Sequence, residues 1–157
     1  MSELNELRKL NADLEKKLAD ASKTAKPKVE GLAGLDESIT IYGTDSWNGH
    51  SSRWDHTLTW GELFTLIAPY LLQNPSDRDV RYYLDSTIYK LTKRERSNRS
   101  IDDQAFQTVK IQLMALGLVG TEYAANVRGV MTLFWSLTPA GKTTLFQLRT
   151  VKSEKSD

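Results

Sequence analysis

The fold is decided by the stretch from Ser100 to Val151, which reads SIDDQAFQTVKIQLMALGLVGTEYAANVRGVMTLFWSLTPAGKTTLFQLRTV. Its first part, Ile101–Leu116, carries apolar residues at helical spacing and stops at a glycine. Two segments with the pattern of strands follow, Leu118–Ala124 and Met131–Thr138, with a polar tip at 126–129 between them. A last helix is then predicted to begin, with Thr138 as its N-cap and Pro139 in its first turn. This order predicts the second half of a winged helix-turn-helix, a fold that binds nucleic acid, binds protein or pairs with itself.

An N-terminal hairpin is predicted in front of these elements. Ile39–Gly43 and Trp54–Trp60 both alternate apolar and polar residues, which is typical of strands with one buried face. Between them lies Asn48-Gly49, and both of these residues tolerate the positive φ that a tight hairpin turn requires.

Two further helices are predicted between the hairpin and Ser100. Thr59 precedes Glu62 at the spacing of a capping box, so the first helix is expected to start there. Asn74 is the predicted N-cap of the second helix, with proline in its first turn. Lys90–Ser100 is predicted to be a basic loop, and Ser100 to cap the third helix. The sequence therefore predicts an α+β, winged helix-turn-helix-like domain over residues 38–151, followed by a disordered tail at 152–157.

Residues 1–22 predict a separate coiled-coil helix. With Leu4 at heptad position a, leucines or Asn11 occupy most of the a and d positions, which is typical of a parallel two-stranded coiled coil. The predicted dimerisation residues are Leu4, Leu7, Asn11, Leu14 and Leu18. Three heptads make a marginal helix in isolation, so a solvated amphipathic helix is the alternative. Residues 23–37, with Pro27 and two glycines, predict a flexible linker.

Composition argues against several classes of protein. The 157-residue chain has a net charge of +1 and no cysteine, so neither a disulfide framework nor a thiolate metal site is expected. His50 and His56 are the only histidines. No run of residues is long and apolar enough to cross a membrane, and the N-terminal segment is charged. We therefore expect a cytoplasmic, non-enzymatic protein with no metal and no cofactor.

Nucleic-acid binding is one function that the predicted fold allows. In this fold the third helix reads base edges, and here it offers Gln104, Gln107 and Lys110 as candidates. Asp102 and Asp103 at its start would repel phosphates. From Gly31 onward the chain holds 14 Lys and Arg against 14 Asp and Glu, so the domain as a whole has no excess of positive charge.

The loop before the third helix is the exception to this neutrality. Lys90–Ser100 holds five cations and one acidic residue, and Arg128 lies at the predicted wing tip. The basic candidates for nucleic-acid contact are therefore Lys90, Lys93, Arg94, Arg96, Arg99 and Arg128. Charge runs are more often simply solvated, which is the alternative.

The aromatic residues suggest protein contact as a second function. Trp60 and Trp135 lie in strongly patterned elements and are predicted core residues. Trp47 lies beside a turn and Tyr82 on the polar side of its helix, so these two are the candidates for an exposed contact surface.

Several segments together resemble a known family. They are LTWGELF at 58–64, IAPYL at 67–71, DDQAFQTVKIQL at 102–113 and FWSLTPAG at 134–141, behind a leucine-rich helix and a Pro/Gly linker. They are similar to the C-terminal tail of bacterial proteins of unknown function that carry an N-terminal TIR-like domain. The resemblance spans nearly the whole chain, but its motifs are structural, so it implies no catalytic residue.

The sequence leaves two functions open. The first is a regulatory or interaction module that forms a homodimer through its N-terminal helix and docks protein partners. The second is a winged-helix nucleic-acid-binding protein that uses the third helix and the basic loop at 90–99.

Overall fold

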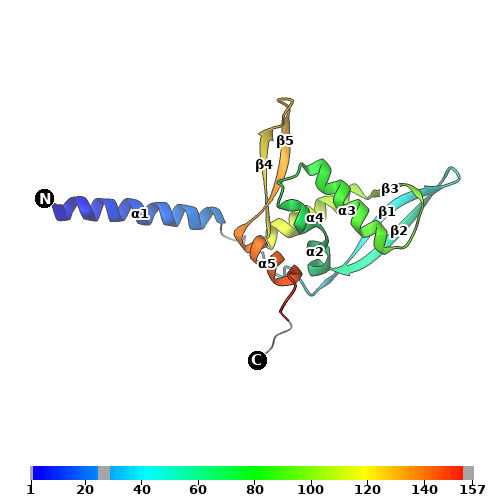
Figure 1. Cartoon of the computed structure of the whole chain (residues 1–157), viewed down its shortest axis with the longest axis horizontal. Helices are drawn as coiled ribbons and strands as arrows, with labels where there is room; N and C mark the ends of the chain where they lie inside the picture. Colours follow the sequence, from blue (N-terminus) through cyan, green and yellow to red (C-terminus); the bar gives the residue numbers. More distant parts are fainter. Residues whose placement is uncertain (1, 25–28, 154–157) are drawn as a thin grey trace.

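A computed structural model describes residues 2–24 and 29–153, except for the side chains of 18–24. It has an α+β fold in which an N-terminal helix precedes mixed helices and two small antiparallel sheets (Figure 1). The elements are α1 (Ser2–Thr24), β1 (Ser38–Trp47), β2 (His50–Thr59), α2 (Trp60–Leu71), α3 (Asp77–Leu91), β3 (Ser97–Ile101), α4 (Asp103–Ala115), β4 (Val119–Ala125), β5 (Met131–Leu137) and α5 (Pro139–Arg149).

The predicted N-terminal hairpin is confirmed and is longer than expected. β1 and β2 pair in antiparallel register from Ser38 opposite Thr59 to Trp47 opposite His50. Asn48 and Gly49 form the turn with φ of 49° and 79°, which matches the left-handed conformation that their types permit.

A third strand on the other edge of β1 was not predicted. β3 lies within the segment expected to be a loop and pairs with β1, placing Ile101 opposite Gly43. A Cβ on Gly43 would lie 2.5 Å from the Ser100 carbonyl oxygen, so only glycine allows this close approach. Ile101, predicted as the start of the third helix, is instead a buried strand residue.

Two of the four predicted N-caps are wrong. Thr59 and Thr138 do accept hydrogen bonds from backbone N–H groups of α2 and α5. The second helix begins two residues later than predicted, however, because Asn74 has φ of 51° and Ser76 provides the cap. Ser100 belongs to β3, so α4 begins after Asp102, whose side chain makes no capping bond. Pro75 therefore lies before the cap of α3 and not in its first turn.

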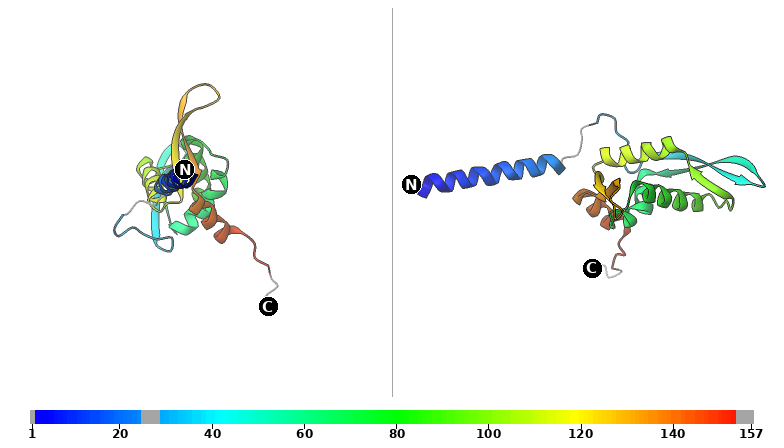
Figure 2. Two further views of the ribbon diagram at one scale, coloured as in Figure 1. Left: turned by 90° about the vertical axis from the view of Figure 1, so that its left-hand side faces the viewer. Right: turned by 90° about the horizontal axis from the view of Figure 1, so that it is seen from above.

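The core lies where the three helices α2, α3 and α4 meet the two hairpins, β1–β2 and β4–β5. Phe106 of α4 stacks on Trp135 of β5 with ring centroids 5.9 Å apart, and both are almost completely buried. The predicted burial of Trp60 and Trp135 is thus confirmed. β4–β5 stands out from this core as a long ribbon, and β1–β2 extends in another direction (Figures 1 and 2).

The segment between α2 and α3 also contacts the second hairpin. Ser76 forms a single antiparallel bridge with Phe134, and the Trp135 N–H donates to the Pro75 carbonyl over 2.9 Å. Two residues from between the helices thus lie against β5 on the edge opposite β4.

Part of the predicted linker is held against the body, by which we mean residues 38–149. Residues 25–28 lie outside the described part of the chain. Beyond them, the Gly61 and Trp60 N–H groups donate to the carbonyls of Leu35 and Glu37, and the Gln112 side chain donates to Ala33. The predicted linker therefore contributes packed residues from Ala33 onward. At the other end, residues 151–153 have no regular structure and 154–157 are not described.

Candidate functional site

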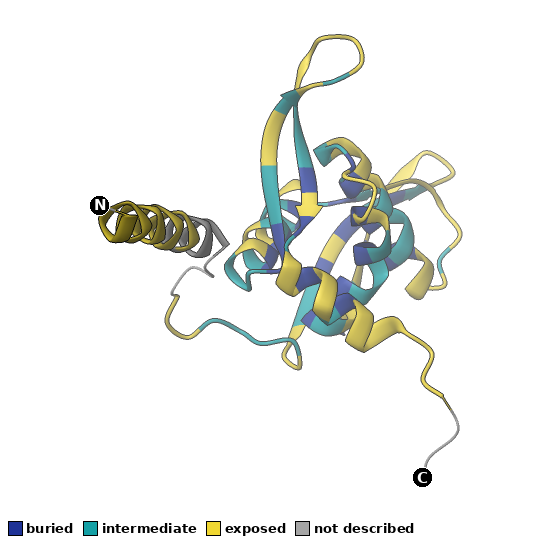
Figure 3. Cartoon of the chain, turned by 60° about the vertical axis from the view of Figure 1, so that its left-hand side comes forward, coloured by how far each residue is buried: buried dark blue, intermediate teal, exposed yellow. Residues whose placement is uncertain are grey.

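The predicted dimerisation residues lie on α1, and each of them whose side chain is described is exposed. All described side chains of α1 are exposed, as the yellow part of this helix in Figure 3 shows. Leu4, Leu7 and Leu14 retain 53%, 59% and 53% of their accessible surface. Leu10, which the heptad assignment places beside the seam, is equally exposed at 54%. The side chain of Leu18 lies outside the described residues. The stripe therefore has no partner within the described part of the chain.

The exposed face of α4 is nearly free of charge. It presents Gln104, Thr108 and Ile111, and Ile111 is 65% exposed. Gln104 and Thr108 border a shallow hollow of about 310 Å³ against β1, which is lined by Ile39, Thr40 and Tyr42 among others. A face of this kind offers few groups to phosphate.

Two of the predicted base-reading residues, Gln107 and Lys110, form hydrogen bonds or ion pairs within the protein. Lys110 is 13% exposed at its side chain and forms an ion pair with Asp77 of α3, with Nζ 2.8 Å from Oδ1. The indole N–H of Trp135 donates to the same oxygen over 2.8 Å. Gln107 accepts from Lys110 over 3.1 Å and donates to Asp103 over 3.4 Å. These bonds join α4 to α3 and β5.

The two aspartates at the start of α4 are also paired. Arg53 of β2 lies 2.7 Å from Asp102, and Arg81 of α3 lies 2.9 Å from Asp103. These pairs satisfy the carboxylates and fix the N-terminal end of the helix between two neighbouring elements.

One of the five cations in the basic segment, residues 90–99, forms an ion pair with a buried carboxylate. Arg94 donates through Nε and Nη2 to the two oxygens of Asp45, at 2.7 and 3.0 Å. Asp45 is 2% exposed and also accepts from the hydroxyls of Tyr89, at 2.9 Å, and Ser52. The hydrogen bonds from Arg94 above all hold the pKa of Asp45 well below its usual value, against the opposing effect of burial.

The other four cations of this segment remain on the surface. Arg96 donates to the Ser52 hydroxyl over 2.8 Å, and the Arg99 guanidinium lies 5.9 Å from the ring centroid of Tyr89. Lys90, Lys93, Arg96 and Arg99 are all exposed.

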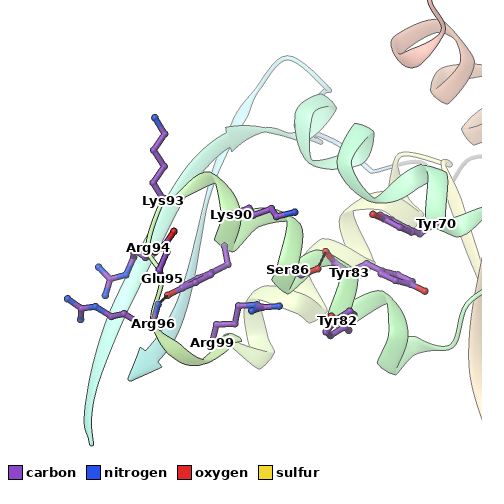
Figure 4. Close-up of a pocket in the computed structure, with 11 residues that line it drawn as sticks. Tyr70, Tyr82, Tyr83, Ser86, Lys90, Lys93, Arg94, Glu95, Arg96 and Arg99 are labelled. Carbon is purple, nitrogen blue, oxygen red and sulfur yellow. Dashed lines mark hydrogen bonds between the residues drawn. The ribbon is translucent and has the colours of Figure 1, made fainter. Parts of the chain in front are cut away.

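A groove of about 550 Å³ joins the basic segment to tyrosines that sequence reasoning did not connect with it. Tyr70 of α2 stacks on Tyr83 of α3 with centroids 4.3 Å apart and planes 9° from parallel. Tyr82, 61% exposed as predicted, meets Tyr83 edge-on at 6.0 Å. Ser86, Lys90 and Arg99 line the same groove (Figure 4). Trp47, the other predicted contact residue, is 58% exposed at the far hairpin tip.

A second hollow, of about 880 Å³, adjoins this groove at Tyr83. It lies between the start of α3 and the tip of the β4–β5 ribbon. Arg78 of α3 and Arg128 at the tip supply its cations, and Asp79 opposes them. The structure thus places Arg128 on the same side of α3 as Tyr83.

Asp85 of α3, which precedes the groove residue Ser86 in the chain, has an unusual carboxyl group. Its Oδ1 is buried and has no hydrogen-bond partner among the described atoms. Partial burial raises the pKa of Asp85 to about 6, although the charges of Arg99 and Arg81 act in the opposite direction.

Other kinds of site were sought in the described residues. They contain no group of three or more histidine, aspartate or glutamate residues placed to hold a metal ion. No described helix is long and apolar enough to cross a lipid bilayer. No protein-family model matches the chain, and comparison with curated proteins and with solved structures finds no match to either. The resemblance to the tail of TIR-like proteins stays a prediction.

Proposed function

We propose that this protein is a non-enzymatic regulatory and interaction module that forms a homodimer through α1 and docks protein partners with its body. The observation that carries the proposal is the leucine stripe of α1. Its described leucines each expose about half of their surface, and no described residue covers them. An exposed single helix of this length is marginal in water, so a partner helix is the natural source of its stability.

The identity of the seam residues supports a second copy of the same helix as that partner. Leucines at d positions favour parallel pairing, and the Asn11 side chains of two copies would meet at one a position. A hydrogen bond between the two amides offsets their burial and selects two strands in register. Arg8 and Glu3 flank the seam, where they can pair between chains.

We further propose that residues 60–149 form a winged helix. α2, α3 and α4 would be its three helices and β4–β5 its wing, with Pro75 and Ser76 as the short third strand. The contact of that short strand with Phe134 and Trp135 supports this assignment, because a winged helix pairs the segment after its first helix with the wing. β3 would then be an extension of the turn between the second and third helices.

The surface of α4 favours protein over duplex DNA as the contact of this winged helix. Ile111 projects into solvent, and Gln107 and Lys110 are committed to internal bonds. The alternative function, duplex reading by α4 with the 90–99 segment, therefore loses Lys110 and Arg94 from its contact set. An apolar residue framed by polar ones is typical of a protein contact.

Sedimentation equilibrium of the 157-residue protein tests the homodimer. We expect reversible dimers, and Leu7→Glu should shift the protein to monomer because it places a charge at a d position. Lys9→Glu, at an outer heptad position, is the matched control and should leave the dimer intact. Asn11→Ile should tighten association and admit higher oligomers. A strict monomer at high concentration, unchanged by Asn11→Ile, would refute the proposal.

A further inference from the structure

The groove on the outer side of α3 combines free cations with flat aromatic surfaces. We call the set Tyr70, Tyr82, Tyr83, Ser86, Lys90 and Arg99 the tyrosine groove. In Figure 4, Lys90 and Arg99 extend along α3 toward Ser86 and the tyrosines, whereas Lys93, Arg94 and Arg96 point elsewhere. Two cations and three phenol rings therefore face one open channel.

The two cations of the tyrosine groove, Lys90 and Arg99, lack a close acidic partner among the described residues. Neither Lys90 nor Arg99 forms an ion pair with any carboxylate in the described part of the chain. By contrast, Arg94 is neutralised by Asp45, so it belongs to the scaffold rather than to the groove. Glu95 is the one acidic residue among those that line the groove. An anionic ligand would find the positive charge of Lys90 and that of Arg99, which Asp85 offsets only in part, without a close ion pair.

The tyrosines provide the second half of a recognition surface. Tyr70 and Tyr83 form one parallel stack, and Tyr82 stands beside it with 61% of its surface exposed. Large aromatic rings left open to water on a helix are available for stacking against another flat group. Unpaired nucleobases use such rings in a way that tolerates any base.

The groove also has room to continue. Tyr83 lines both the tyrosine groove and the adjoining hollow that leads to the wing tip. Arg78 and Arg128 stand along that second hollow. A chain of phosphates could therefore run from Arg99 and Lys90, past the rings, toward Arg128.

From this arrangement we propose that the tyrosine groove binds single-stranded nucleic acid, with bases stacked on the tyrosines and phosphates on Lys90 and Arg99. A duplex hides its base faces, so it could use the cations but not the rings. An acidic peptide without aromatic side chains has the same restriction, because its carboxylates pair with the cations and leave the rings unused. The groove lies within one body, so the proposal does not depend on self-association through α1.

Fluorescence anisotropy with labelled oligo-dT and oligo-U of twenty nucleotides tests this proposal. We expect binding at low salt. The logarithm of the association constant should fall linearly with the logarithm of the salt concentration. Lys90→Gln with Arg99→Gln should weaken binding and lower the magnitude of that slope, since two phosphate contacts are lost. The two probes distinguish DNA from RNA as the source of the strand.

The tyrosine variants separate stacking from simple charge attraction. Tyr82→Ala should weaken binding about tenfold, while Tyr82→Phe should restore most of it because the ring remains. Lys142→Gln removes an exposed cation of α5 outside the groove and should leave the affinity unchanged. Both positions are exposed, so thermal melts of the variants should match the parent protein.

Several outcomes would overturn the proposal. One is no binding of either strand at low ionic strength. Another is an equal loss of affinity from Lys142→Gln and from the groove variants. A third is tight binding of a duplex or of polyglutamate with the same affinity in the parent protein and in Tyr82→Ala, which would show that the groove binds through charge alone. In each of these cases the dimer could still be present by sedimentation, so the two proposals fail independently.

Discussion

Arg94 holds the buried carboxylate of Asp45 in a two-pronged contact, with Nε 2.7 Å from Oδ2 and Nη2 3.0 Å from Oδ1. The two residues are separated by 49 positions in the chain. Asp45 lies on β1 and Arg94 just before β3, so this pair fastens the segment after α3 to the first hairpin. The path of the chain between α3 and β3 thus depends on a contact made far away in sequence.

Removing Asp45 should therefore destabilise the body strongly. Asp45→Ala leaves the Arg94 guanidinium and the Tyr89 and Ser52 hydroxyls without their common acceptor, and we expect a loss of about 3 kcal/mol of unfolding free energy. Urea denaturation followed by tryptophan fluorescence measures it. Asp55→Ala, an exposed position on β2, is the control and should change stability by less than about 0.5 kcal/mol. Equal effects of the two variants would contradict this role of Asp45.

The same pair should make the protein sensitive to acid. The pKa of Asp45 in the folded state lies below its ordinary value of 3.8, so the folded state holds this proton less tightly than the unfolded state. Its contribution to stability is complete well above pH 3.8 and is lost as the pH falls through that value and below it. The destabilisation caused by Asp45→Asn should therefore shrink between about pH 5 and pH 2. A difference that stays constant over that range would show that the charge of Asp45 does not stabilise the fold.

Asp85 should have the opposite pH dependence. Its pKa is raised from 3.8 to about 6, so the folded state binds this proton more tightly than the unfolded state. The stability that the protonated group contributes is complete below about pH 4 and is lost as the pH rises through about 6. Asp85→Asn should raise the unfolding free energy at pH 7.5 by about 1 kcal/mol, a value reduced for solvent screening of a half-exposed group. The gain should vanish near pH 4. Thermal melts at both pH values measure the effect, and a loss of stability at pH 7.5 would contradict it.

Local signals in the sequence were enough to predict most of the elements. The Asn48-Gly49 turn and the caps at Thr59 and Thr138 depend on interactions within a few residues, and the structure has them as expected. β3 could not be found in this way, because Ser97–Ile101 has no alternating pattern. Its strand geometry comes from pairing with β1, which lies far away in the chain.

The candidate site was only partly predictable for the same reason. The density of positive charge at 90–99 was visible, but the partner that neutralises Arg94 was not, since Asp45 carries no local mark of burial. The stack of Tyr70 on Tyr83 results from the packing of α2 against α3. The spacing of residues within each helix does not indicate that the rings of Tyr70 and Tyr83 will meet.

Lys110 should matter for stability rather than for nucleic-acid contact. Lys110→Met removes the ion pair to Asp77 while it keeps an unbranched side chain over the Phe106 ring, which lies 5.0 Å from the amine. We expect a loss of about 2 kcal/mol, because the Asp77 carboxylate stays partly buried without its cation. Affinity for oligo-dT should stay within a factor of two of the parent protein. A selective loss of affinity at unchanged stability would instead favour reading by α4.

Gly141 should be irreplaceable in the packing of α5. A Cβ built there would lie 2.0 Å from the Leu118 carbonyl oxygen, and main-chain atoms cannot move aside as a flexible side chain can. Alanine favours a helix over glycine by about 1 kcal/mol, but the overlap should outweigh this gain and cost about 3 kcal/mol in total.

Gly120 provides the matched control for that substitution, because it lies in β4 of the same half of the body. A Cβ at Gly120 would meet only the Ser136 hydroxyl at 3.9 Å, an ordinary contact, so Gly120→Ala should be neutral or slightly stabilising. Urea denaturation of the two variants compares them directly. If Gly141→Ala were as stable as Gly120→Ala, α5 would have to sit farther from Leu118 than the structure places it, and the cap that Thr138 gives to this helix would have to move with it.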